Sequence, residues 1–301
     1  ISELNQSYAA SGGAPPVTEA FYEANMKELV SARDALTAAI SQDAMLEQAV
    51  EGIDNAIDSL PFNEDTLNAQ LNQAGVAVSA AKDALDALEK TLTEVWGRTL
   101  KAHPFATDYM AQLKARLETV RRVHPGFLRA WKAIDNLEIQ SSENLIERCE
   151  AIERQHPAPF AIRIHGDFNA NNVIFNTETR HINYIDFYRS RDADYVQDAS
   201  VFLVSNFRMP VFEPALRTRM NRVIRRFYDF MTNFARTHED TSFELRMALA
   251  LARSLYTSTR FELNQNFAQD MFTRAHYLME KVLDHQGPRQ TFRLEREVLF
   301  Y

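Results

Sequence analysis

The chain has 301 residues, of which 46% are hydrophobic and 11% aromatic, so it can bury a substantial core as one large domain or two smaller ones. Its net charge of −8 argues against a nucleic acid or an anionic membrane surface as the main partner. No apolar run in the sequence is long enough to cross a membrane. Cys149 is the only cysteine, which excludes an intramolecular disulfide and is typical of a cytoplasmic protein.

The first third of the chain is predicted to be a linker followed by helices. Residues 1–16 are small, polar and proline-containing, as in a linker. From residue 17 to about 103, apolar residues recur at three- and four-residue spacing, which predicts a helical bundle or hairpin. Its helices are expected at 17–40, 45–60 and from about 63 to near 104. These stripes indicate mutual packing, and the alternative is a protein partner bound through residues 17–103.

The remainder, residues 104–301, is predicted to be one further domain. Helical patterns cover most of it, and strand patterns surround only one central motif, so the expected class is α+β and mainly helical. The helices are expected at 108–122, 125–134, 141–156, 213–238, 242–257 and 259–285.

The strongest chemical signal is a short motif of the form H-x-D-x-x-x-x-N, made by His165, Asp167 and Asn172. Phosphoryl-transfer enzymes of the kinase type place a catalytic Asp and, five residues later, a Mg²⁺-binding Asn at this spacing. A hydroxyl group that attacks a γ-phosphate must lose a proton, and Asp167 could accept it. The alternative is a polar surface turn without chemistry.

Strand patterns lie on both sides of the motif. The apolar segment 160–164 precedes it, and the segments 173–175 and 181–187 flank a polar turn and predict a hairpin. This hairpin would return Asp186 to the side of Asn172. A carboxylate and an amide oxygen, both hard ligands suited to Mg²⁺, are therefore expected to converge on one cavity.

From residue 165 to about 200 the sequence resembles the aminoglycoside phosphotransferase and choline kinase family. In that family, H-G-D-x-x-x-x-N is followed by a strand ending in I-D and by D-P-x-x-D at the start of a helix. Asp194 and Asp198 stand at the two acidic positions of the last motif, and Tyr195 replaces its Pro. The resemblance implies a protein kinase-like fold, with ATP and Mg²⁺ as cofactors and a small molecule as phosphate acceptor.

The resemblance also implies roles for individual residues. Asp167 would be the catalytic base, and Asn172 and Asp186 would bind Mg²⁺ and thereby the nucleotide. Asp198 would be a buried anchor for the loop backbone, which agrees with its place in an apolar helical pattern, where a buried acid needs hydrogen-bond donors. His165 belongs to the catalytic motif and is expected to support the loop backbone.

Other charged residues near the motif carry weaker signals. Asp194 is predicted to cap the helix that contains Asp198. Together with Asp192 it could also attract a cationic, amino-bearing acceptor. Three arginines follow the motif closely and could either meet phosphate or form surface ion pairs: Arg189, Arg191 and Arg208.

An amino-terminal kinase lobe, with a Gly-rich loop and a strand Lys, is not recognisable upstream of the motif. Three explanations stay open: the lobe precedes Ile1 in a longer protein, residues 17–103 replace it, or the protein no longer binds ATP. The predicted function is that of a small-molecule kinase, present as a fragment without its nucleotide-covering lobe. The alternative is a non-catalytic, kinase-like scaffold that binds another protein through its helical segment.

Overall fold

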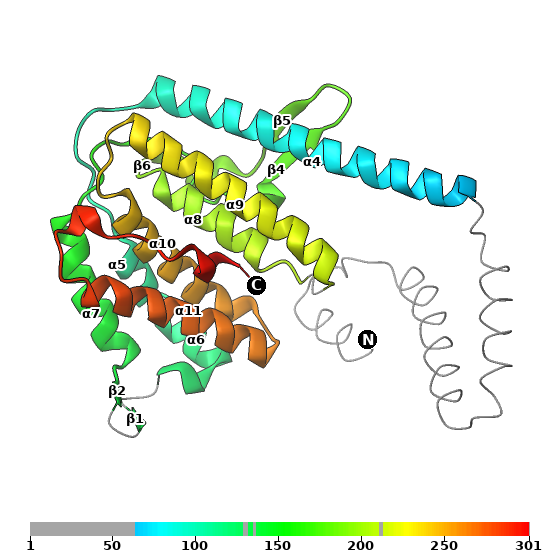
Figure 1. The fold of residues 1–301 in the computed structure, drawn as a ribbon. Coiled ribbons are helices and arrows are strands. Elements are labelled where there is room, and N and C mark those ends of the chain that lie inside the picture. The colour runs from blue at the N-terminus through cyan, green and yellow to red at the C-terminus, as the bar shows by residue number, and fades with distance from the viewer. Residues whose placement is uncertain (1–63, 129–131, 135–136, 211–212, 301) are drawn as a thin grey trace, which may run out of the picture. The chain divides into compact units, whose positions relative to one another are not determined.

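The structure is a computed structural model and describes residues 64–128, 132–134, 137–210 and 213–300 (Figure 1). The predicted linker 1–16 and the helices predicted at 17–40 and 45–60 lie outside these residues. The backbone divides into two compact units, residues 1–79 and 80–301, and the described residues belong to the second unit apart from the first part of one helix. The predicted domain boundaries stay predictions.

The described chain is mainly helical. Its α-helices are α4 (Glu64–Thr99), α5 (Tyr109–Lys114), α6 (Leu117–Val123), α7 (Ser142–Gln155), α8 (Val196–Phe207), α9 (Pro214–Thr237), α10 (Phe243–Ser258) and α11 (Gln265–Asp284). Short 3₁₀ helices are η2 (Pro125–Leu128), η3 (Ala170–Asn172), η4 (Phe187–Arg189), η5 (Thr259–Phe261), η6 (Arg289–Thr291) and η7 (Arg296–Leu299).

Short strands pair locally and form no large sheet within the described residues. They make three antiparallel pairs: β1 (Lys132–Ile134) with β2 (Leu137–Ile139), β3 (Ile162–Ile164) with β6 (Arg191–Ala193), and β4 (Val173–Asn176) with β5 (His181–Tyr184). The predicted mainly helical α+β composition agrees with this arrangement.

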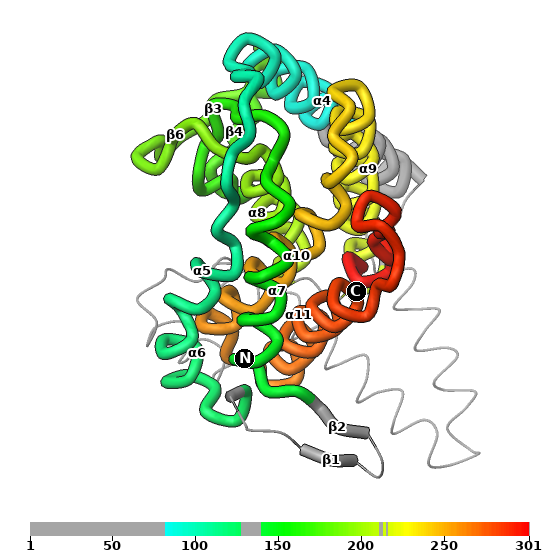
Figure 2. The backbone as a smooth tube through the Cα atoms, turned by 90° about the vertical axis from the view of Figure 1, so that its left-hand side faces the viewer, coloured from blue at the N-terminus to red at the C-terminus, as the bar shows by residue number. Residues whose placement is uncertain are grey.

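Helix α10 lies at the centre of the fold. Nearly all of its side chains are buried because α5, α8 and α11 pack against it. Helix α7 in turn contacts α5, α10 and α11, as Figure 2 shows, and α9 lies against α8. A helix that is buried on nearly all sides lies inside the protein, so α10 forms the core on which the other helices are arranged.

The carboxyl-terminal half of α4 joins this core. Leu88, Leu92 and Trp96 recur every four residues and are 2%, 5% and 1% exposed. The Trp96 ring packs against Tyr195, with 5.7 Å between the ring centroids. The helix predicted from about residue 63 is therefore confirmed, and it packs on α9, where Trp96 contacts Phe230 and Phe234, as well as on Tyr195 at the start of α8.

The predicted helices near 141–156, 213–238 and 242–257 are also confirmed, as α7, α9 and α10. Ser141 caps α7, since its hydroxyl accepts the N–H of Asn144 at 3.2 Å. These long segments combine a clear 3.6-residue period with ordinary helix ends, which makes them readable from sequence.

The helix predicted at 125–134 is wrong. The described parts of this segment are the 3₁₀ turn η2 and the strand β1, which pairs with β2. Pro125 can start a helical turn, but Gly126 directly after it has a poor helix propensity, and the strand pairing with the following segment prevails over the local pattern.

Two other helices differ from the prediction: one is divided in two, and one begins later than expected. The helix expected at 108–122 is divided into α5 and α6 by a break after Lys114. The helix expected from residue 259 begins only at Gln265, because Asn264 caps it by accepting the N–H of Phe267 at 3.1 Å. The residues before that cap form η5 instead.

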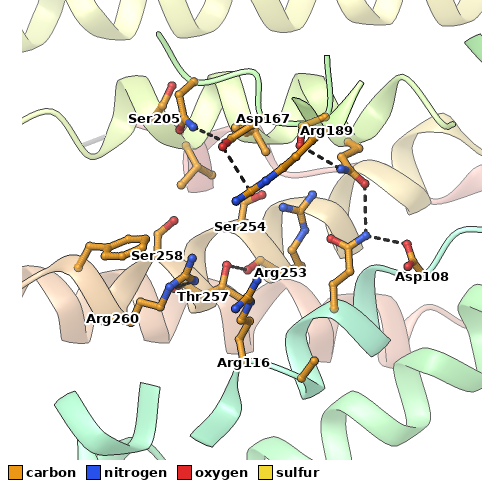
Figure 3. A pocket seen from close by; sticks show the side chains of 18 of the residues that line it. Asp108, Arg116, Asp167, Arg189, Ser205, Arg253, Ser254, Thr257, Ser258 and Arg260 are labelled. Carbon is orange, nitrogen blue, oxygen red and sulfur yellow. Dashed lines mark hydrogen bonds and ion pairs between the residues drawn. The ribbon is translucent and has the colours of Figure 1, made fainter. Parts of the chain in front are cut away.

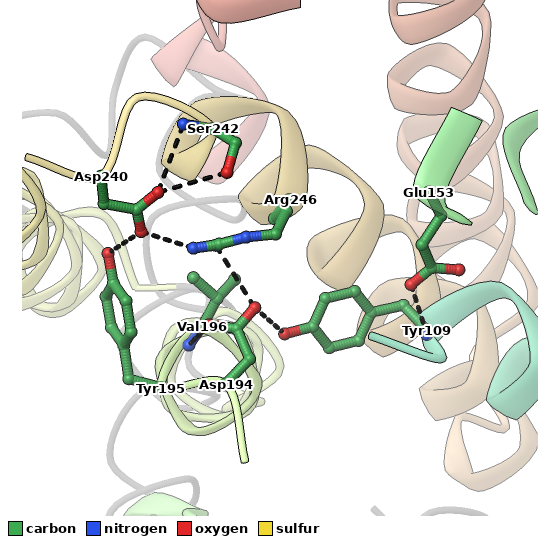
Figure 4. Close-up of polar contacts among 8 residues, drawn as sticks. All are labelled: Tyr109, Glu153, Asp194, Tyr195, Val196, Asp240, Ser242 and Arg246. Carbon is green, nitrogen blue, oxygen red and sulfur yellow. Dashed lines mark hydrogen bonds and ion pairs between the residues drawn. The ribbon is translucent and has the colours of Figure 1, made fainter. Parts of the chain in front are cut away.

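A buried cluster of charges fixes α8 against α10 and α5 (Figure 4). Arg246 of α10 is fully buried and pairs with Asp194, at 3.4 Å, and with Asp240. Tyr109 donates a hydrogen bond to Asp194 at 2.8 Å, and Tyr195 donates one to Asp240 at 2.7 Å. Each buried carboxylate thus has a cation and a hydroxyl partner, which a buried charge requires.

Candidate active site

The loop of the H-x-D-x-x-x-x-N motif follows β3 and is held from behind by Asp198 of α8. This carboxylate is 1% exposed and accepts the backbone N–H groups of His165, at 2.6 Å, and Gly166, at 2.9 Å. Burial raises the pKa of Asp198 to about 6, and the two N–H donors act against that rise. Asp198 therefore fixes the turn that precedes Asp167.

His165 connects the loop to the end of the hairpin. Its Nε2 atom lies 2.7 Å from the carbonyl oxygen of Ile185, while its Nδ1 atom accepts the N–H of Asp167 at 3.3 Å. These two contacts fit a neutral imidazole with its proton on Nε2. Both ring nitrogens are used for backbone contacts, so His165 is placed to support the loop.

Asn172 is held in a defined orientation. Its Nδ2 atom donates to the backbone carbonyl of Asp167 at 2.8 Å, so the side-chain oxygen points away from that contact. The N–H of Ile185 donates to the Asn172 carbonyl at 3.1 Å, and the β4–β5 hairpin pairs Val173 with Tyr184. The predicted hairpin is confirmed, and it brings the chain at Asp186 back to Asn172.

Asp186 has an unusual backbone conformation. Its φ of 67° lies in the left-handed region, which a non-glycine residue adopts at a cost of about 1 kcal/mol or more. Its side chain is exposed, and among the described residues no hydrogen bond or ion pair joins its carboxylate to another side chain. Strained acidic residues with unused oxygens are typical of ligand-binding positions.

A cavity of about 1090 Å³ opens beside the loop (Figure 3). Asp167 lines it, together with Gly166 and Asn169 of the same loop, whereas Asn172 and Asp186 do not. The expected convergence of Asn172 and Asp186 on a cavity of their own stays a prediction. Asp167 faces the cavity, and the two predicted Mg²⁺ ligands lie outside it.

The Asp167 carboxylate has two polar contacts inside the protein. Asn169 donates to its Oδ1 atom, and Arg189 lies 3.3 Å from its Oδ2 atom. Arg189 follows the hairpin directly, in η4, so the loop and the hairpin both position this carboxylate.

The cavity wall is rich in arginine. Sequence reasoning singled out Arg189, Arg191 and Arg208, all of which line the cavity, but it missed three others. The missed residues are Arg116 at the start of α6, Arg253 in α10 and Arg260 in η5. Nothing in the sequence links these positions, because only tertiary packing brings α6, α10 and η5 to the same cavity.

The acids expected to attract a cationic acceptor have other roles. Asp192 pairs with Lys101 and, at 3.0 Å, with Arg163, and Asp194 is buried against Arg246. Neither lines the cavity. Their positions therefore argue against a part in binding a cationic acceptor.

Asp194 caps the start of α8, as predicted. Its Oδ1 atom accepts the N–H of Val196 at 3.2 Å, and Tyr195 between them already has helical backbone angles, with φ −61° and ψ −23°. Asp194 thus contributes to the start of the helix, and its second oxygen belongs to the buried cluster around Arg246.

The donor set near the hairpin fits Mg²⁺ as a cofactor. The described residues contain no group of three or more His, Cys, Asp or Glu side chains that could hold a metal. Mg²⁺ needs no such group, since it usually binds one or two protein oxygens and completes its shell with phosphate and water. Asn172 and Asp186 can supply two oxygens of this kind.

A helical fold with this loop defines a phosphotransferase-like protein. Residues 67–231, more than half of the chain, match the phosphotransferase enzyme family, and the chain belongs to that family. The matched region contains the whole motif from His165 to Asp198, and the predicted resemblance is confirmed. No curated protein and no solved structure matches the chain. Among the described helices, none is both long and apolar enough to span a membrane.

Proposed function

We propose that the chain catalyses transfer of the γ-phosphate of ATP, with Mg²⁺, to a hydroxyl group of a small molecule, and that residues 104–301 form a kinase-like catalytic lobe. One observation carries this proposal. The Asp167 carboxylate lies on a loop fixed by Asp198 and lines a cavity of about 1090 Å³, large enough for a metabolite-sized acceptor.

Under this proposal each reactant has its own place beside the loop. The acceptor occupies the cavity, with its hydroxyl hydrogen-bonded to Asp167, which takes the proton as the oxygen attacks phosphorus. The phosphates lie on the other side of the loop, where Asn172 and Asp186 would hold Mg²⁺. The metal, when bound, supplies positive charge that stabilises the transferring phosphoryl group.

Apolar surface beside Asp186 supports a further covering element. Ile185 and Phe187, on either side of Asp186, are 44% and 53% exposed, and Ile174 on β4 is 47% exposed. Large exposed apolar side chains that gather in one place mark a binding surface. This surface supports the predicted need for a nucleotide-covering segment on that side of the loop.

Replacement of Asp167 by Asn tests the proposal. The amide keeps the size of the side chain and cannot accept the proton, so we expect the rate of phosphate transfer to fall by about a thousandfold or more. ADP formation from ATP and Mg²⁺ would be measured against a set of hydroxyl compounds, and circular dichroism would check that the variant folds.

A matched control is Asp270→Asn, which removes an acid that pairs with Arg274 on the surface of α11. This variant should retain the wild-type rate. If Asp167→Asn also transferred phosphate at the wild-type rate, Asp167 would not be the base and the proposal would fail.

A further inference from the structure

The cavity beside Asp167 has a strongly positive lining. Among the described residues, six guanidinium groups and the two carboxylates of Asp108 and Asp167 line it, which gives this lining a formal excess of four positive charges. The whole chain has a net charge of −8, so this concentration of cations is opposite to the average of the molecule. The arginines are Arg116, Arg189, Arg191, Arg208, Arg253 and Arg260.

Three of these arginines lack an acidic partner among the described residues. Arg253 is 8% exposed, donates to the Ser200 hydroxyl at 3.2 Å, and its Nε atom is buried without a partner in the described part of the chain. Arg260 donates to the backbone carbonyl of Thr257, and Arg116 is exposed. A buried cation without an anion is unfavourable, so the site is electrostatically incomplete without a ligand.

The arginines also act on one another. Burial, followed by the charges of Arg116, Arg208 and Arg189, lowers the pKa of Arg260 to about 10. Such mutual repulsion is relieved when an anion binds between the guanidinium groups, which present paired donors to phosphate and carboxylate oxygens.

The positions of these groups give the bound molecule a direction. Figure 3 shows Asp167 and Arg189 on one wall of the cavity and Arg116 and Arg260 on the opposite wall. A molecule with its anionic group at Arg116 and Arg260 therefore extends its other end toward Asp167. The hydroxyl groups of neighbouring lining residues add further hydrogen-bonding partners along this path: Ser254, Thr257 and Ser258.

We propose that the acceptor is an anionic alcohol, a small molecule that carries a phosphate or carboxylate group in addition to the hydroxyl group that receives the new phosphate. This inference rests on the proposed function. The nucleotide phosphates are not the anion in question, because the two oxygens suited to their Mg²⁺, on Asn172 and Asp186, lie outside the cavity.

Calorimetric titration of the full chain tests the inference, with inorganic phosphate, ribose 5-phosphate, gluconate and choline as probes. At least one of the three anions should bind, and choline should not. Phosphate compared with gluconate tells which anionic group the site prefers. Arg260→Gln and Arg116→Gln should each weaken binding of the preferred anion about tenfold or more, as expected for the loss of a charge-assisted contact.

Arg122→Gln is the matched control. Arg122 lies on α6, the helix that begins directly after Arg116, but it pairs with Glu118 and does not line the cavity. It should bind the anion as the wild type does. Melting temperatures of all three variants would show that each is folded.

The inference is overturned if no anion binds, if both cavity variants bind as well as Arg122→Gln, or if choline binds more tightly than the anions. Competitive displacement of the anion by a non-hydrolysable ATP analogue would also overturn it, by assigning the arginines to the nucleotide.

The two proposals can fail separately. If the chain phosphorylates a neutral or cationic acceptor in a reaction that requires Asp167 but not Arg260, the proposed anionic acceptor is wrong and the proposed phosphotransferase activity stands. If an anion binds and its binding requires Arg260, but the chain never consumes ATP, the proposed anion site stands and the proposed phosphotransferase activity is wrong.

Discussion

Gly166 shows how one residue sets the shape of the catalytic loop. Its φ is +86°, and a Cβ atom at this position would lie 2.3 Å from the carbonyl oxygen of Arg189. Gly166→Ala should therefore displace Arg189 or the loop and lower the free energy of unfolding by about 2 kcal/mol or more, which urea titration would measure.

Gly97→Ala provides the comparison, because no atom lies within 4 Å of the added Cβ and the residue is part of α4. This change should leave stability unchanged or raise it by up to about 1 kcal/mol. Equal stabilities for the two variants would mean that the loop adapts freely to a side chain at Gly166.

His276 should make the folding stability of the protein depend on pH. Its Nε2 atom lies 2.9 Å from the Ser142 hydroxyl, and burial lowers its pKa from 6.5 to about 4. Between these values the unfolded chain binds a proton that the folded chain does not, so stability is lost as the pH falls from about 6.5 to about 4. The loss amounts to roughly 3 kcal/mol.

Urea unfolding of the wild type and of His276→Gln at pH 7 and pH 5 would check this. The wild type should lose more stability than the variant between the two pH values, since only the wild type has the histidine to protonate. Parallel losses would show that His276 titrates normally in the folded protein.

At the scale of residues, sequence and structure agree best where the chemistry is local. The spacing of His165, Asp167 and Asn172 placed them correctly on one loop, and the apolar pattern around Asp198 placed it inside the protein. The positions of Arg253, Arg116 and Arg260 on one cavity wall could not be predicted from the sequence, because their proximity depends on how distant helices pack.

Helices and strands differ in how much of them the sequence reveals. Helices such as α7 and α10 extend over several turns, and their period and end residues predict them. The strands of the β1–β2 and β3–β6 pairs have three residues each, too few for a recognisable alternation. Strand β6 was missed and the segment at 125–134 was mistaken for a helix for this reason.

The packing of helix α4 against the core should depend mainly on the buried side chain of Trp96. Trp96 is 1% exposed and packs on Tyr195, so Trp96→Ala should lower the free energy of unfolding by about 3–5 kcal/mol through the lost contacts and the cavity left behind. The neighbouring Val95 is 38% exposed, and Val95→Ala should change stability by less than about 1 kcal/mol. Chemical unfolding monitored by circular dichroism compares them, and a small effect of Trp96→Ala would show that α4 is not needed for the core.

For the molecule as a whole, the buried cluster around Arg246 decides whether the helices stay together. Arg246→Met would leave the carboxylates of Asp194 and Asp240 buried without their cation, and we expect a loss of about 3–5 kcal/mol. Arg226→Met removes a partly exposed arginine that pairs with acids on α4, and it should cost about 1 kcal/mol or less.

Thermal melting of both variants would measure the difference. If Arg246→Met were as stable as Arg226→Met, the two acids must become protonated at little cost, and the cluster would not hold α8 to α10.

The opposite signs of the whole chain, at −8, and of the cavity lining have a kinetic consequence. In about 0.1 M salt, charges more than about 10 Å away are largely screened, so an approaching anion is attracted by the guanidinium groups only near the opening. Long-range attraction therefore contributes little to its rate of arrival. Added salt should shorten the time that the anion stays bound far more than it slows its encounter with the protein.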